Sequence, residues 1–176
     1  NSSGAAGGAV KWNPTYPSTH LVENCTFDGN SATTDGGAVH VSPGSSSASA
    51  PVIIGSTFTG NSAGTSGGAL YSSDGDGPKP VAVKETTFTG NSAPIGAAVG
   101  GSSYWHGEYY LENCLIAGNT GGYAIHSNGW RVNNDYALDL AYCTVVDNPG
   151  GGIYANQAYT AGDMGLRVRN SIITSN

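Results

Sequence analysis

Apolar and polar residues alternate in a short pattern that returns six times along the chain. In residues 25–30, 56–61 and 86–91, a small residue is followed two positions later by an apolar one, and an asparagine closes the segment. Residues two apart on a strand face the same side, so the small and apolar positions point inward and the residue between them points outward. The pattern predicts one short strand in each repeat.

The inward apolar positions form a ladder with one residue from each repeat. Its members are Phe27, Phe58, Phe88, Ile116, Val145 and Ile173. The closing asparagines follow one another at intervals of 28 to 31 residues, and we interpret them as turn residues: Asn30, Asn61, Asn91, Asn119 and Asn148, with Asn176 closing the last repeat. A period in this range is typical of supersecondary units stacked on one another.

Two further strands are predicted in each repeat. Upstream of the first strand, a second inward column contains Val22, Ile53, Val83, Leu111, Leu140 and Val168. The residue between these two strands is Asn24 in one repeat and Gly55 in the next, and both tolerate the left-handed backbone of a sharp bend. A third strand is predicted after the asparagine turn, at residues 8–10, 37–39, 68–70, 97–99, 123–125 and 151–153.

Three short strands separated by bends describe one coil of a parallel β-helix, in which no coil can bury its apolar side alone. We therefore predict an all-β fold, a right-handed parallel β-helix (β-solenoid) of about six coils. It forms a single domain over residues 1–176 that is open at both ends. The right hand follows from the usual chirality of parallel crossovers.

Composition excludes several classes of function. The chain has a net charge of −6 and only six Lys and Arg residues, which argues against nucleic-acid binding. No apolar run is long enough to span a bilayer. Abundant Ser, Thr, Asn and Gly with few charges favour an extracellular or cell-surface protein.

The repeat motifs resemble those of the chlamydial polymorphic outer-membrane proteins. Phe-x-x-Asn occurs at residues 27–30, 58–61 and 88–91, and Gly-Gly-Ala-(Val/Leu) occurs at residues 7–10, 36–39 and 67–70. The match covers roughly residues 1–100, because later repeats replace the phenylalanine. The resemblance implies a right-handed β-helix surface protein. It does not specify an activity, because the same coil carries adhesins, structural spikes and polysaccharide-cleaving enzymes.

Catalysis by paired carboxylates is not predicted. Glycosidases need two carboxylates about 5–9.5 Å apart, and the aligned strands suggest no pair within two coils. Lys84, Glu112 and Arg169 share one outward column, but Ile54 and Ala141 interrupt it. We predict no catalytic site and no cofactor.

A weak calcium candidate lies in the Asp-Gly-Asp-Gly segment that contains Asp74 and Asp76. The rest of an EF-hand pattern is absent, so a plain insertion loop is favoured over a metal site. The histidines lack ligand spacing, although His40 and His126 occupy equivalent outward positions.

Aromatic residues suggest a docking surface for sugars or proteins: Tyr104, Trp105, Tyr110 and Trp130. The alternative is that these side chains cover the side of the solenoid. Two sequons, at Asn1 and Asn24, are candidate glycosylation sites.

Outward threonines are in register at Thr57-x-Thr59 and Thr87-x-Thr89. Ice-binding β-helices use such arrays, but this one fails at Asp28, Ala117 and Val146 and covers only two coils, so ordinary β-propensity explains it at least as well.

The cysteines are interpreted as small buried thiols. Cys25 is too far from the others to pair, and a bridge between Cys114 and Cys143 on adjacent coils is left open.

The chain starts and stops part-way round a coil, and joining residue 176 to residue 1 completes a coil with one extra residue. We therefore expect copies of the chain to stack head to tail into a filament or surface appendage. One alternative is a passenger or stalk segment of a larger adhesin, with a host surface or a polysaccharide as its target. Another is a polysaccharide lyase or hydrolase domain.

Overall fold

The computed structural model describes residues 1–14, 20–42, 51–73, 80–103, 109–129, 136–157 and 164–176. These residues form 23 short strands. No helix in the described ranges is long and apolar enough to cross a bilayer.

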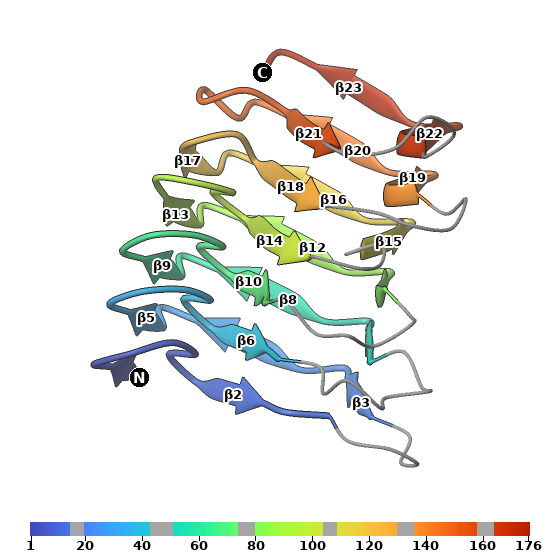
Figure 1. Cartoon of the computed structure of the whole chain (residues 1–176). Helices are drawn as coiled ribbons and strands as arrows, with labels where there is room; N and C mark the ends of the chain where they lie inside the picture. The colour runs from blue at the N-terminus through green and yellow to red at the C-terminus, as the bar shows by residue number, and fades with distance from the viewer. Residues whose placement is uncertain (15–19, 43–50, 74–79, 104–108, 130–135, 158–163) are drawn as a thin grey trace.

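The strands form four parallel sheets, which run side by side along the axis of the molecule (Figure 1). Sheet A contains β1 (Ser2–Ser3), β5 (Ser31–Ala32), β9 (Ser62–Ala63), β13 (Ser92–Ala93) and β17 (Thr120–Gly121). Sheet B contains β2 (Val10–Trp12), β6 (Val39–Val41), β10 (Leu70–Ser72), β14 (Val99–Ser103), β18 (Ile125–Gly129) and β21 (Ile153–Gln157).

The other two sheets each have six strands. Sheet C contains β3 (Leu21–Glu23), β7 (Val52–Ile54), β11 (Val81–Lys84), β15 (Tyr109–Glu112), β19 (Tyr136–Ala141) and β22 (Met164–Arg169). Sheet D contains β4 (Thr26–Asp28), β8 (Thr57–Thr59), β12 (Thr87–Thr89), β16 (Leu115–Ala117), β20 (Thr144–Val146) and β23 (Ile172–Thr174). Each strand pairs in parallel with its equivalents on neighbouring coils, which confirms the predicted β-solenoid.

The path of each coil differs from the prediction in two details. The strands of sheet A are a fourth strand in the coil. They are two residues long, follow the asparagine directly and were not predicted from the sequence. The third predicted strand also begins later, because β6 starts at Val39 and not at Gly37. A Cβ on Gly37 would lie 2.0 Å from the carbonyl oxygen of Gly68, so the two coils touch backbone to backbone at this turn.

The inward columns fill the interior of the solenoid. The ladder has fully buried members at its centre: Phe58, Phe88, Ile116 and Val145. The rings of Phe27 and Phe58 stack with centroids 4.6 Å apart. Ile173 is 43% exposed because no coil of this chain lies above it.

The bend between sheets C and D has a positive φ on every coil: Asn24, Gly55, Glu85, Asn113, Tyr142 and Asn170. The bend predicted from Asn24 and Gly55 is therefore confirmed, and it accommodates glutamate and tyrosine as well. The segments that the structure does not describe all fall between a strand of sheet B and the next strand of sheet C.

Candidate functional site

The closing asparagines form a ladder of amides inside the corner between sheets D and A. Nδ2 of Asn61 donates to Oδ1 of Asn91 at 2.9 Å and to the carbonyl oxygen of Phe27 at 3.0 Å. The backbone N–H of Asn61 donates to the same Oδ1 of Asn91 at 3.0 Å. The side-chain link recurs on successive coils, from Asn1 through Asn30, Asn61, Asn91, Asn119 and Asn148 to Asn176.

The amide ladder changes the role predicted for these asparagines. The left-handed residue of this turn is the one before the asparagine, for example Gly60 with a φ of 61°. Asn61 and Asn91 are fully buried, and their side chains hold the coils together. The sequence contains one signal for this role, which is that asparagine closes every repeat. An exposed turn would accept several polar residues.

Charged side chains gather on the outer face of sheet C. Nζ of Lys84 and a carboxylate oxygen of Glu112 lie 2.8 Å apart on adjacent strands. Each side chain favours the charged form of the other, so the hydrogen bond raises the pKa of Lys84 and lowers the pKa of Glu112. Tyr110 lies on the same face, and the ammonium of Lys84 is 5.5 Å from the centre of its ring.

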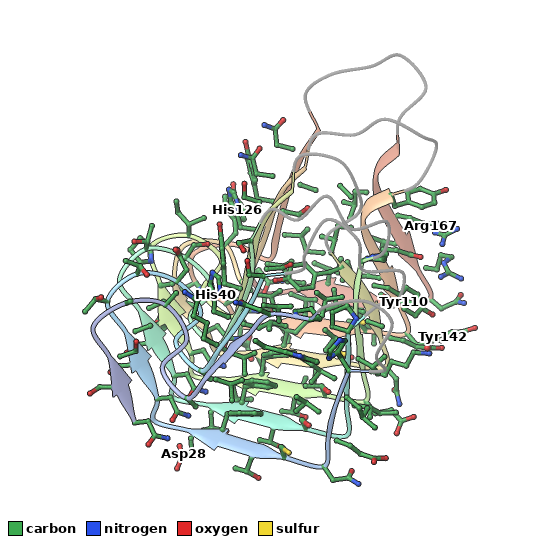
Figure 2. All side chains as sticks on the ribbon, turned by 60° about the horizontal axis from the view of Figure 1, so that its bottom comes forward. Asp28, His40, Tyr110, His126, Tyr142 and Arg167 are labelled. Atoms are coloured by element: carbon green, nitrogen blue, oxygen red, sulfur yellow. The ribbon has the colours of Figure 1, made fainter. Side chains whose placement is uncertain are left out.

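A second charged group lies further along sheet C. Asp139 is 7% exposed and pairs with two arginines, Arg167 at short range and Arg169 at 3.3 Å. The carboxylate raises the pKa of Arg167, whose guanidinium also lies over the ring of Tyr136 at 4.1 Å. Figure 2 shows Arg167 on the same side of the molecule as Tyr110 and Tyr142.

The charged face corrects one expectation from the sequence. Glu112 and Asp139 lie on the paired strands β15 and β19, offset by two residues, since Tyr110 is opposite Asp139. One coil and two residues place their Cα atoms about 8 Å apart, so a carboxylate pair does lie within two coils. Both carboxylates are nevertheless held in ion pairs with cations.

An open groove of about 560 Å³ runs along the corner between sheets C and D. It is lined by Ile54, Lys84, Glu85, Glu112, Asn113 and Tyr142. Its lining is polar and apolar in similar measure. Within the described part of the chain, no three His, Cys, Asp or Glu side chains are grouped to hold a metal ion.

Two histidines lie on the outer face of sheet B, and Figure 2 places them away from the charged face. His40 and His126 share an outward column with Tyr71 and Gly100. The ring of His126 stacks on Tyr154 with centroids 4.6 Å apart. Burial lowers the pKa of both histidines, and Nδ1 of each is buried without a hydrogen-bond partner among the described residues.

Several predicted site residues lie outside the described residues: Asp74, Asp76, Tyr104, Trp105 and Trp130. Of the predicted docking surface, only Tyr110 is described.

The two sequons differ in their surroundings. Nδ2 of Asn1 donates to Oδ1 of Asn30 at 3.0 Å, so a glycan on that nitrogen would displace a ladder hydrogen bond. Asn24 is exposed at its bend and is the more suitable acceptor of the two.

The cysteines are free thiols. Cys114 and Cys143 are neighbours in the core, at 3% and 1% exposure. The hydrogen bond between the two thiols, together with burial, raises the pKa of Cys114. The side chains therefore fill an inward column.

Comparison with known proteins identifies the fold family. The chain matches none of the curated proteins and none of the solved structures with which it was compared. A family model described as a right handed beta helix region matches residues 15–176, which is most of the chain. With its stacked parallel coils, the chain belongs to the right-handed β-helix family.

Proposed function

We propose that this chain is a non-catalytic structural solenoid outside the cell. Its end coils stack on further coils of the same geometry, supplied by a second copy of the chain, to build a filament or surface appendage. The observation that carries the proposal is the amide ladder, which has a direction and continues onto the first and last described coils.

The direction of the ladder makes the two ends complementary. On each coil, N–H groups of one asparagine donate to Oδ1 of the asparagine on the following coil, as Asn61 does to Asn91. The first coil therefore presents an amide oxygen, that of Asn1, and the last coil presents amide N–H groups, those of Asn176. Copies stacked in the same direction match donor to acceptor, whereas inverted copies oppose like groups.

Apolar exposure on the last coil supports the same contact. Ile173 is 43% exposed, whereas Val145, its partner on the preceding coil, is fully buried. Leu166 and Val168 on β22 are 44% and 39% exposed. A coil stacked above them would remove this apolar surface from water, which stabilises by about 25 cal/mol per Å².

A second candidate function is a stalk or passenger segment of a larger adhesin. Further coils of a longer chain would satisfy the same donors and the same apolar surface. The resemblance of residues 1–100 to the chlamydial surface-protein repeats favours this candidate, with a host surface or a polysaccharide as the target.

A polysaccharide lyase or hydrolase is the least favoured candidate. The carboxylates of Glu112 and Asp139 are the best placed for it, but Lys84 and Arg167 neutralise them. A general acid needs a raised pKa, and the lowered pKa of Glu112 is the opposite.

Electron microscopy of the purified chain tests the proposal. Head-to-tail stacking predicts unbranched fibres with an axial repeat of about 29 Å, which is six strand spacings. Ile173→Asp should abolish the fibres because it buries a charge between coils. The matched control is Thr174→Asp, whose side chain points outward and which should leave them intact.

Two outcomes would redirect the proposal. Monomers of the unmodified chain at every concentration would contradict the filament and favour the adhesin segment. Release of reducing sugar from a polysaccharide, lost in Asp139→Asn, would favour an enzyme.

A further inference from the structure

The outer face of sheet D has an unusual composition. Each of its six strands presents two outward side chains: Thr26, Asp28, Thr57, Thr59, Thr87, Thr89, Leu115, Ala117, Thr144, Val146, Ile172 and Thr174. Seven of the twelve are threonine and four are aliphatic. The face has no aromatic and no basic side chain, and its one charge, Asp28, lies on the first coil.

Sheet C provides a control for β-propensity. Its outward positions are Leu21, Glu23, Val52, Ile54, Ala82, Lys84, Tyr110, Glu112, Asp139, Ala141, Arg167 and Arg169. None of these twelve is threonine, and six are charged. A general preference of strands for threonine would enrich both sheets, so it does not explain a face that is confined to sheet D.

The threonine face is regular because the strands of sheet D are in strict register. Thr57 is opposite Thr26 on one side and Thr87 on the other. The hydroxyl oxygens of Thr59 and Thr89 lie 3.5 Å apart. The repeat is about 4.8 Å from coil to coil and about 6.6 Å between the two columns. The register therefore sets methyl and hydroxyl groups in a regular array over the first three coils, with both columns filled by threonine on the second and third, and Leu115 and Ala117 interrupt it on the fourth.

Stacked rings support the threonine face from inside, and its side chains are exposed or half-buried. Beneath it, the stacked rings of Phe27, Phe58 and Phe88 fix the strands from inside, with adjacent centroids 4.6 and 4.9 Å apart. The segments outside the described residues all connect sheet B to sheet C, so none of them joins two strands of sheet D. Figure 2 shows Asp28 at the outer side of this layer, away from the charged face of sheet C.

The chemistry of the face selects its ligand. Sugar-binding surfaces use aromatic rings for stacking, and ionic partners need charge, but apart from Asp28 on its first coil the threonine face offers neither. Methyl groups order the water around them, and regularly spaced hydroxyls hydrogen-bond to that water. A regular array of such groups is best matched by a ligand that is itself a regular array of water molecules.

We propose that the outer face of sheet D binds ice. This function does not depend on the stacking of end coils, because the threonine face lies on the side of the solenoid. Asp28 is a defect at one margin, since a charge holds its own water shell and opposes an ice-like arrangement.

The test is to grow ice in a solution of the purified chain. Two quantities are measured: the thermal hysteresis and the partition of the labelled protein into the ice. We expect the unmodified chain to inhibit growth and to enter the ice. The double variant Thr59→Lys, Thr89→Lys should lose both effects, because two ammonium groups interrupt the array at its centre. The matched control is Ala82→Lys, which places the same charge on an outward position of sheet C and should retain both.

A third variant separates a loss of ice binding from a loss of folding, because it is expected to gain activity. Asp28→Thr extends the array by one position and should increase the hysteresis. Circular dichroism melting of all variants verifies that the solenoid is intact.

Four results would overturn the proposal. Ice growth unaffected by the unmodified chain would do so, as would full activity in the folded double variant. A lateral dimer in liquid water that the double variant dissociates would instead assign the face to a second copy of the chain. Retention on insoluble chitin or cellulose, lost in the double variant but not in Ala82→Lys, would assign it to a crystalline polysaccharide.

Discussion

Asn91 lies at the centre of the amide ladder, where its Oδ1 accepts two hydrogen bonds from Asn61 and its Nδ2 donates to Asn119 and to the carbonyl oxygen of Phe58. Asn91→Leu should lower the free energy of unfolding by about 3 kcal/mol or more, because it leaves buried donors and acceptors unpaired. Denaturant unfolding measures the change.

The control for Asn91 is Asn156, whose amide donates to Asn128 at 3.2 Å on the exposed surface. Asn156→Leu should change the free energy of unfolding by less than about 0.5 kcal/mol. Equal losses in the two variants would mean that the ladder is no stronger than a surface contact.

Histidine burial sets a pH dependence of stability. The folded pKa values of His40 and His126 are lowered, so the unfolded chain binds protons more readily than the folded one. Their contribution is therefore fully present above the unfolded pKa of about 6.5 and is lost as pH falls below it. Burial raises the pKa of Asp35, which faces His40. The contribution of Asp35 to the free energy of unfolding therefore increases as pH falls, in a more acidic range.

Denaturant unfolding between pH 7.5 and 5 tests the histidine effect. The free energy of unfolding should fall on acidification. In the His126→Gln variant this free energy should fall less steeply than in the unmodified chain. An unchanged slope in this variant would indicate that His126 takes up its proton without cost in the folded state.

At the scale of the element, the turn that enters sheet B depends on glycine. A Cβ on Gly68 would lie 2.1 Å from the carbonyl oxygen of Ala97 on the next coil, a backbone atom that cannot move aside alone. Gly68→Ala should destabilise the chain by about 3 kcal/mol, the upper part of the range for overpacking.

Gly4 is the control for this effect, because its Cβ would meet nothing within 4 Å. Gly4→Ala should leave the melting temperature unchanged or slightly raised. A Gly68→Ala variant as stable as Gly4→Ala would show that the coils can separate at this turn without cost.

For the molecule as a whole, stability is a sum over coils and their interfaces, so the position of a residue decides its contribution. Ile116 is fully buried between coils, whereas Ile173, in the same ladder, is 43% exposed. Ile116→Ala should cost about 2–5 kcal/mol, and Ile173→Ala about 1 kcal/mol or less in the monomer.

Unfolding of dilute monomer provides the comparison between the two isoleucines. Under conditions where fibres form, the proposed stacking buries Ile173. The two variants should then lose similar amounts of stability. Equal losses in dilute monomer would mean that the last coil is already covered.

Much of the fold could be predicted from the repeat. The inward columns, the bends at Asn24 and Gly55 and the parallel stack depend on local alternation and on a fixed period, which are both visible in the chain. The strands of sheet A could not be predicted, since two residues are too few to show an alternation; they are recognised only by hydrogen bonds to neighbouring coils, as when Ser62 donates its backbone N–H to Asn30.

The candidate sites were less accessible from the sequence. Glu112 and Asp139 flank Leu111 and Leu140 in the alignment of inward columns, but the sequence analysis compared residues only within a column and so missed this offset pair, which the register of β15 with β19 shows. Asp139 also meets Arg167 and Arg169 only because β22 stacks on β19.

The sequence by itself determined that this protein is a solenoid, because a repeated apolar pattern with a period near 30 residues leaves each unit dependent on its neighbours. The tertiary structure decided that the asparagines are buried ladder groups and not exposed turns, because their partners lie one coil away. It also decided which charges pair, because the ion pairs join side chains of neighbouring coils. A face of a solenoid is the sum of the same position over all coils, and its exposure depends on where every connection passes.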